Sequence, residues 1–117
     1  MRIIPASVHG VLDYLVAVSL IAGPFVLGFE GVAKLLAVAG GVGLIAYSLI
    51  TDYSTSARRL IPFRTHLLFD FLAAVVLVIA PFAFGFATLA TYFYVAIGAA
   101  VILVVLVTNP ETGEAAA

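Results

Sequence analysis

The chemistry that this sequence can offer is concentrated in two histidine–aspartate pairs. His9 is followed four residues later by Asp13, and His66 is followed at the same spacing by Asp70. Residues four apart share one face of a helix, so each pair presents an imidazole beside a carboxylate. Together they form a candidate polar cluster that holds the fold together, binds a metal ion such as zinc or iron, or relays protons.

We favour the structural interpretation of this cluster. A charge buried in an apolar environment needs a partner whether or not it has a further function. Each aspartate is therefore expected to accept hydrogen bonds from a histidine or a nearby arginine and to hold a helix end in place. A His–Asp spacing of four is common in helices, and no HExxH signature accompanies it. We predict no metal ligand, and a metal ion stays an alternative.

Axial ligation of haem or a chlorophyll-type pigment by His9 or His66 is a weaker alternative. Each histidine has an acidic neighbour one turn away, and two ligands of one haem would have to face each other across the ring. No cofactor is predicted. The hydroxyl groups of segment 51–56 have no histidine close in sequence to act as a base. We therefore predict that the protein is not an enzyme.

The composition places these residues in a membrane. Of the 117 residues, 65% are apolar and 9% are charged, and the mean hydropathy is +1.29, whereas roughly 25% of residues are charged in soluble domains. The chain has no cysteine, which excludes disulfides and thiolate metal sites. A net charge of −1 without a basic run gives no support for nucleic-acid binding. An integral membrane protein in contact with the lipid bilayer is predicted.

Four segments are long enough to cross a bilayer as helices, which takes about 20 residues. They cover residues 8–27, 32–50, 66–84 and 89–107. None alternates between apolar and polar residues as a lipid-facing barrel strand does. Pro5 and Pro62 are expected in the first turns of the first and third helices, where proline is tolerated. The predicted fold is an all-α membrane protein with four transmembrane helices.

The four helices form two tandem repeats. Aligning residues 4–29 with residues 61–86, an offset of 57, gives 12 identities in 26 positions, including both histidines and both aspartates. The repeats are residues 1–57 and 58–117, each a helical hairpin, and the second ends in a short polar tail. Two spans per repeat give both hairpins the same orientation, so we expect a pseudo-two-fold axis along the membrane normal.

Two further motifs recur with the repeat. Proline late in a helix followed by glycine is typical of a helix end, which we favour over a hinge for gating. The helix-end motif comprises Pro24, Phe25, Gly28 and Phe29 in the first repeat, and Pro81, Phe82, Gly85 and Phe86 in the second. Small residues in the second and fourth helices allow close helix packing. Those expected to pack are Ala37, Gly40, Gly41, Ala96 and Gly98.

Basic residues predict the orientation, because lysine and arginine are retained on the cytoplasmic side. The N-terminus and the central linker carry Arg2, Arg58, Arg59 and Arg64, whereas the opposite side carries only Lys34. Both termini are therefore expected in the cytoplasm, with the protein in the cytoplasmic (inner) membrane.

The paired hairpins, each with a proline and an aromatic residue late in its first helix followed by Gly-Phe, resemble the SPW-repeat family of small bacterial and archaeal integral membrane proteins. The resemblance extends from Ile4 to about Thr108. This chain has Gly23-Pro24-Phe25 and Ala80-Pro81-Phe82 where the family often has Ser-Pro-Trp. The resemblance implies hairpin repeats in a membrane and brings no activity with it.

From the sequence we expect a non-enzymatic membrane protein that self-assembles or serves as an accessory subunit of a larger membrane complex. Its partners would be lipid and further copies or other membrane-protein subunits, through small-residue faces. The alternative is ion or proton conduction or metal handling by the His/Asp quartet.

Overall fold

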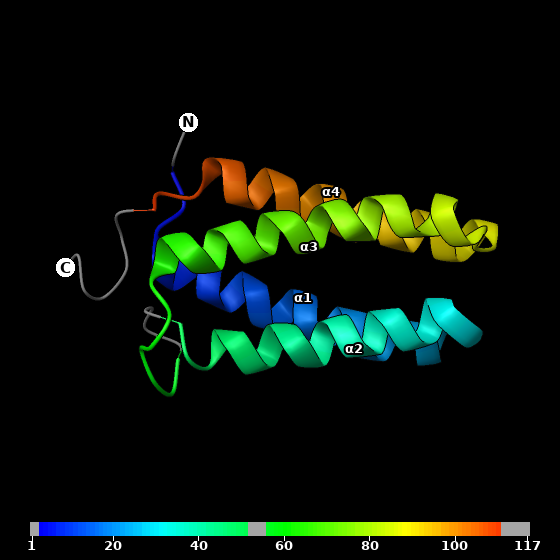
Figure 1. The fold of residues 1–117 in the computed structure, drawn as a ribbon, viewed down its shortest axis with the longest axis horizontal. Coiled ribbons are helices and arrows are strands. Elements are labelled where there is room, and N and C mark those ends of the chain that lie inside the picture. Colours follow the sequence, from blue (N-terminus) through cyan, green and yellow to red (C-terminus); the bar gives the residue numbers. More distant parts are fainter. Residues whose placement is uncertain (1–2, 52–55, 111–117) are drawn as a thin grey trace.

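The computed structural model describes residues 3–51 and 56–110 and consists of four helices (Figure 1). They are α1 (Ala6–Leu27), α2 (Gly31–Ser48), α3 (Phe63–Phe84) and α4 (Thr88–Val107). All four are long and apolar enough to cross a membrane, and only 17% to 33% of each apolar window is buried inside the bundle. The remaining apolar surface faces outward, as lipid contact requires. The protein is an all-α integral membrane protein, as predicted.

The odd-numbered helices begin directly after a proline. Pro5 and Pro62 precede α1 and α3 with extended backbones, at ψ 162° and 144°. Their carbonyl groups accept the first helical hydrogen bonds, from the N–H groups of His9 and His66 at 3.0 and 3.1 Å. The prolines therefore lie one residue before the first turn and not in it, because a residue at this cap position keeps an extended backbone.

The same helices end at the repeated glycines. Gly28 and Gly85 have left-handed backbones, with φ of 76° and 67°, which glycine adopts without steric cost. The N–H groups of Phe29 and Phe86 then donate to the carbonyl oxygens of Pro24 and Pro81, at 2.8 and 2.9 Å. The chain thereby reverses into α2 and α4. Each hairpin turn uses the helix-end motif in the same way.

Within each hairpin the helices approach closely at one glycine. A Cβ atom added to Gly41 would lie 2.7 Å from the carbonyl oxygen of Ala17, and one added to Gly98 would lie 2.9 Å from that of Ala74. Both glycines and both alanines are separated by the repeat offset. α2 therefore packs against α1, and α4 against α3, through backbone-to-backbone contact.

The two hairpins meet in a small core toward the end that holds the hairpin turns. Tyr94 of α4 is fully buried there, and its hydroxyl group donates to the carbonyl oxygen of Ala33 in α2. The residue equivalent to Tyr94 in the first repeat is Ala37, which is also fully buried. The core contains Leu20, Phe29, Ala33, Ala37, Leu77, Ala80, Ala90 and Tyr94.

At the opposite end the chain closes the bundle with two backbone bridges. Ile4 pairs with Thr108, and Ile61 pairs with Thr51, each as an isolated parallel bridge. The segment before α1 thus joins the end of α4 in the way that the segment before α3 joins the end of α2. These equivalent contacts are those that a pseudo-two-fold arrangement requires. The pseudo-two-fold axis and its direction along the membrane normal both stay predictions.

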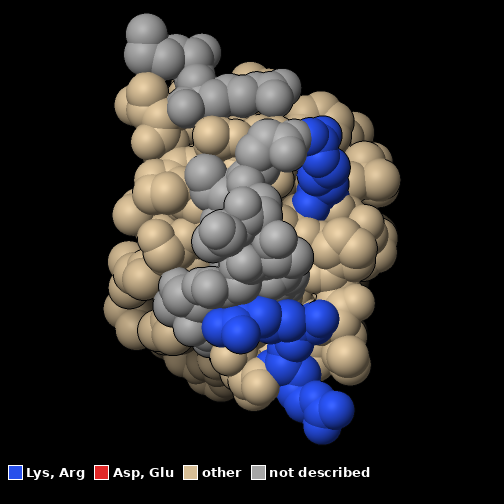
Figure 2. All heavy atoms as spheres, turned by 90° about the vertical axis from the view of Figure 1, so that its left-hand side faces the viewer, with Lys and Arg blue, Asp and Glu red and all other residues tan. Residues whose placement is uncertain are grey.

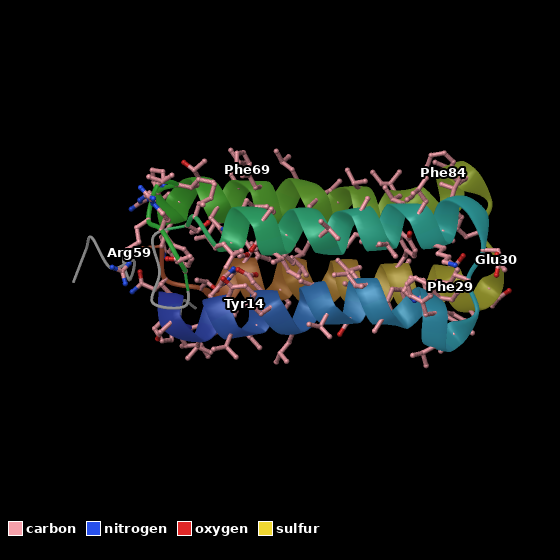
Figure 3. All side chains as sticks on the ribbon, turned by 90° about the horizontal axis from the view of Figure 1, so that it is seen from below. Tyr14, Phe29, Glu30, Arg59, Phe69 and Phe84 are labelled. Atoms are coloured by element: carbon pink, nitrogen blue, oxygen red, sulfur yellow. The ribbon has the colours of Figure 1, made fainter. Side chains whose placement is uncertain are left out.

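Exposed arginines gather at the bridged end of the bundle. Figure 2 views the end that holds the bridges and shows basic side chains there, with no acidic side chain visible among the described residues. Arg58, Arg59 and Arg64 are exposed at this end. Figure 3 shows Glu30 at the far end of the bundle from Arg59. Arg2, which was also expected on this side, and most of the polar tail lie outside the described residues.

Replacing Gly41 with alanine should destabilise the protein by about 1–3 kcal/mol, because the new methyl group overlaps a backbone oxygen that cannot move alone. Gly43→Ala is the matched control, since a Cβ atom there meets no heavy atom within 4 Å, and it should be neutral or slightly stabilising. Reversible unfolding in mixed micelles measures both. Equal effects of the two substitutions would contradict the close approach of α1 and α2.

Candidate functional site

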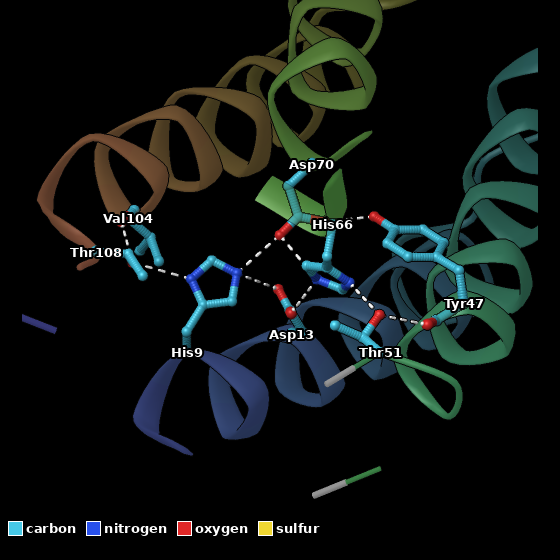
Figure 4. Close-up of polar contacts among 8 residues, drawn as sticks. All are labelled: His9, Asp13, Tyr47, Thr51, His66, Asp70, Val104 and Thr108. Carbon is cyan, nitrogen blue, oxygen red and sulfur yellow. Dashed lines mark hydrogen bonds and ion pairs between the residues drawn. The ribbon is translucent and has the colours of Figure 1, made fainter. Parts of the chain in front are cut away.

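The four predicted polar residues converge at the bridged end of the bundle (Figure 4). His9 and His66 are each the fourth residue of their helix, and Asp13 and Asp70 follow one turn later. All four are buried, with exposed fractions of 0% for the histidines, 5% for Asp13 and 2% for Asp70. The two imidazole ring centres are 5.7 Å apart. We call these residues the His/Asp quartet.

The shortest contacts of the quartet cross between the repeats. His9 Nε2 lies 2.8 Å from Asp70 Oδ2, and His66 Nε2 lies 2.6 Å from Asp13 Oδ2. Within each helix the corresponding histidine–aspartate distances are both 3.2 Å. The pairs seen in the sequence as i and i+4 neighbours are therefore exchanged between α1 and α3. Each hairpin supplies the hydrogen-bond partner that the other needs.

A threonine fixes the second nitrogen of each histidine. Thr108 Oγ1 lies 2.9 Å from His9 Nδ1, and Thr51 Oγ1 lies 2.7 Å from His66 Nδ1. Each threonine hydroxyl donates its own proton to the backbone carbonyl four residues earlier, at Val104 and Tyr47. Because that proton is used, the hydroxyl oxygen accepts from the ring, so Nδ1 of both histidines carries a hydrogen.

This pattern fixes the proton count of the quartet. With Nδ1–H on both rings, each Nε2 and the carboxylate oxygen opposite it both bear lone pairs, so one proton must lie in each of the two short contacts. Two imidazoles, two carboxylates and two bridging protons have a net charge of zero. Neutrality matters because an uncompensated buried charge is costly in a low-dielectric environment. The charges of the quartet are therefore balanced within it.

The site is not fully equivalent in the two repeats. The hydroxyl group of Tyr47 donates to Oδ1 of Asp70, whereas the residue at the equivalent position, Val104, has no hydroxyl group. The Tyr47 ring also lies against His66, with ring centres 4.7 Å apart, and Phe63 lies edge-on against His9 at 5.4 Å. Aromatic rings thus cover both imidazoles.

Thr51, Thr108 and Tyr47 are the site residues that sequence reasoning missed. We considered the hydroxyl groups of segment 51–56 only for a histidine nearby in sequence, yet Thr51 lies beside His66, 15 residues away. The available signal was the repeat, because Thr51 and Thr108 occupy equivalent positions. Nothing comparable marked Tyr47, which has no counterpart in the second repeat.

The trio Thr51, His66 and Asp13 contains the residue types of a hydrolytic triad, but its hydrogen bonds run in another direction. In a triad the hydroxyl donates to the histidine that will accept its proton. Here the Thr51 hydroxyl donates to a backbone carbonyl and accepts from Nδ1. Thr51 is also fully buried. The histidine therefore does not activate this hydroxyl group as a nucleophile.

The carboxylates leave no room for a porphyrin between the imidazoles. Both Nε2 atoms, the positions from which axial ligands would reach a haem iron, lie within 3.2 Å of Asp13 and Asp70 oxygens. A haem shared by His9 and His66 would have to displace both carboxylates. The residues therefore do not fit the haem or pigment site that we considered from the sequence.

Other residues predicted to matter lie in different parts of the bundle. Ala37, Gly41 and Gly98 are buried, whereas Gly40 and Ala96 are exposed. Among the helix-end residues, Pro24, Pro81 and Phe29 are buried, while Phe25 and Phe82 are exposed. The hairpin turns line a cavity of about 530 Å³. Its lining residues include Gly28, Phe29, Gly85 and Phe86, which are far from the quartet in sequence.

A second cavity, of about 260 Å³, adjoins the quartet. It is lined by Asp13, Tyr47 and Asp70 and otherwise by apolar or small residues from all four helices, including Gly40 and Gly43. The carboxylates thus line a space between the hairpins as well as contacting the histidines.

Removing the Tyr47 hydroxyl group should destabilise the protein by about 1.5–3 kcal/mol, the usual value for a hydrogen bond to a charged group. The variant is Tyr47→Phe, and Tyr92→Phe is the matched control because Tyr92 is 69% exposed. The control should change the free energy of unfolding by less than about 0.5 kcal/mol. Thermal and denaturant unfolding in micelles would measure both, and an unaffected Tyr47→Phe protein would contradict the bond.

Comparison with known proteins supports the assignment that the repeats suggested. The family model of the SPW repeat domain matches residues 7–108, which include the His/Asp quartet, both helix-end motifs and nearly all of the four helices. No curated protein and no solved structure matches the chain. The predicted relationship is confirmed by the extent of the matched region. The chain belongs to the SPW repeat family.

Proposed function

We propose that this protein is a non-enzymatic structural subunit of the membrane that acts by lateral association. Its first partners are further copies of itself. The observation that carries this proposal is the outward face of α4. This helix has the smallest buried share of the four, 17% of its apolar window. After Thr88 at its start, its exposed residues follow one side of the helix and are Leu89, Tyr92, Ala96, Ala99, Ala100, Leu103 and Leu106.

Alanines occupy the middle of this α4 face. Ala96 and Ala100 are one turn apart, and Ala99 lies between them. All three are exposed, whereas Gly98 packs against α3. In lipid, where apolar surface gives no preference for another helix over an acyl chain, close approach at small residues is what favours helix association. The exposed alanines therefore suit a second helix in contact.

The chemistry of the quartet supports a role without catalysis. Both ring nitrogens of both histidines take part in hydrogen bonds to other side chains. Each aspartate meets histidines from both repeats. A general base needs access to a substrate proton, and these groups are instead used to join the hairpins.

The arginines of the bridged end support placing that end in the cytoplasm. Arg58, Arg59 and Arg64 are exposed there, while Lys34 belongs to α2 beside the opposite turn. Lysine and arginine near helix ends set orientation during insertion. The proposal therefore places the quartet near the cytoplasmic side of the inner membrane.

Self-association should be measurable in liposomes by single-molecule photobleaching of dye-labelled protein at decreasing protein-to-lipid ratio. The wild type should give two or more bleaching steps. Ala96→Leu together with Ala100→Leu should reduce association by about tenfold or more, because added bulk separates the helices. Ala83→Leu, on the exposed surface of α3, should leave it unchanged. A wild type that remains monomeric at every ratio would overturn self-assembly.

The orientation can be tested with single cysteines, because the chain contains none. In intact cells, a membrane-impermeant maleimide should label Glu30→Cys and should fail to label Ala57→Cys until the membrane is permeabilised. Both positions are exposed. The reversed labelling pattern would show that the bridged end faces outward.

A further inference from the structure

The ligand atoms of the His/Asp quartet converge on one point. One ring nitrogen of each histidine and one carboxylate oxygen of each aspartate all lie within 4.8 Å of one another. The four nitrogen–oxygen contacts of the quartet run from 2.6 to 3.2 Å; Asp70 meets both histidines through Oδ2, whereas Asp13 meets His9 through Oδ1 and His66 through Oδ2. Two bridging protons, one in each short contact, hold these lone pairs close together.

We propose that the quartet is a binding site for one divalent transition-metal ion, held by Nε2 of both histidines and one oxygen of each aspartate. Two imidazole nitrogens and two carboxylate oxygens form a donor set that Zn²⁺ accepts in tetrahedral geometry. Such a site has edges of roughly 3.3 Å for metal–ligand bonds of about 2.0 Å. The distance of 3.2 Å between His66 Nε2 and Asp70 Oδ2 matches this edge. The two proton-bridged pairs must open slightly, and Asp13 must bring a single oxygen to the shared point.

The surroundings of the quartet suit this role. Histidines that bind metals usually donate the hydrogen of the other ring nitrogen to an oxygen, which fixes the ring orientation. Here Thr108 and Thr51 accept from the two Nδ1 groups. The hydroxyl group of Tyr47 holds the other oxygen of Asp70 in the same way. Both histidines thus keep Nε2 directed at the shared point.

The exchange of protons for metal balances in charge. Binding breaks the two bonds that hold the bridging protons and forms two metal–nitrogen and two metal–oxygen bonds, and the two protons leave to the aqueous solution. No electron is transferred. The site has a net charge of zero before the exchange and after it, because one divalent cation replaces two protons. A buried site in a membrane protein therefore avoids the cost of a new uncompensated charge.

This proposal goes beyond lateral association and does not depend on it, since the four ligands come from one chain. It also remains compatible with the structural role of the quartet. A metal ion would join α1 to α3 through the same atoms that the protons now join, so binding should raise the thermal stability of the folded protein.

The experiment uses the full chain in detergent micelles, stripped with a chelator and titrated with Zn²⁺ in buffers of different ionisation enthalpy. We expect one Zn²⁺ per chain, the release of about two protons per ion, and a higher melting temperature. Co²⁺ should give the visible absorption of a tetrahedral site. Excess Mg²⁺ or Ca²⁺ should not compete, because both prefer oxygen ligands.

Variants locate the site. Asp13→Asn with Asp70→Asn should lower the affinity for Zn²⁺ by at least about 100-fold, whereas Glu30→Gln, which changes an exposed carboxylate at the other end, should leave it unchanged. Circular dichroism checks that the double variant remains helical. If that variant does not fold, the wild-type stoichiometry, Co²⁺ spectrum and proton release still decide the matter. Absence of stoichiometric binding to the wild type, or binding that survives the loss of both aspartates, would overturn the proposal.

Discussion

The exchange of histidine–aspartate hydrogen bonds between α1 and α3 is the interaction on which the relation of the two hairpins depends. Each hairpin carries an imidazole and a carboxylate at the same end, and each is completed by the other. Where water is scarce, a hydrogen bond left unmade costs more than at a water-exposed surface. The two hairpins are therefore held in one register at this end, although most of their remaining surface is apolar and free to face lipid.

The register set by the quartet extends to the backbone. His9 bonds to Thr108, which directly follows α4, and Thr108 pairs with Ile4 just before α1. The same sequence of contacts leads from His66 through Thr51 to Ile61. Side-chain and backbone bonds thus connect the start of α1 to the end of α4, and the start of α3 to the end of α2.

Two pairs of equivalent positions carry unequal side chains. Tyr94 fills the space between the hairpins that its counterpart, Ala37, leaves free, and both are completely buried. Two tyrosines would not fit there, since interiors are packed to a nearly constant density. Tyr47 and Val104 differ at the other end, so only one aspartate receives the tyrosine hydroxyl. These unequal pairs give the duplicated chain a single arrangement.

The fold class, the four spans and the identity of the quartet followed from the sequence alone, because membrane spans need long apolar segments and a duplication displays its repeated residues directly. Spacing also placed each histidine beside the aspartate of its own helix, and those contacts exist at 3.2 Å. The shorter contacts, which join residues 53 and 61 positions apart, were decided only by how the two hairpins come together. Likewise, Thr51 and Tyr47 entered the site because α2 ends beside His66, and no local pattern encodes which helix ends meet. Local periodicity determined the elements of this protein, whereas the partners of its buried polar atoms depended on how distant segments come together in three dimensions.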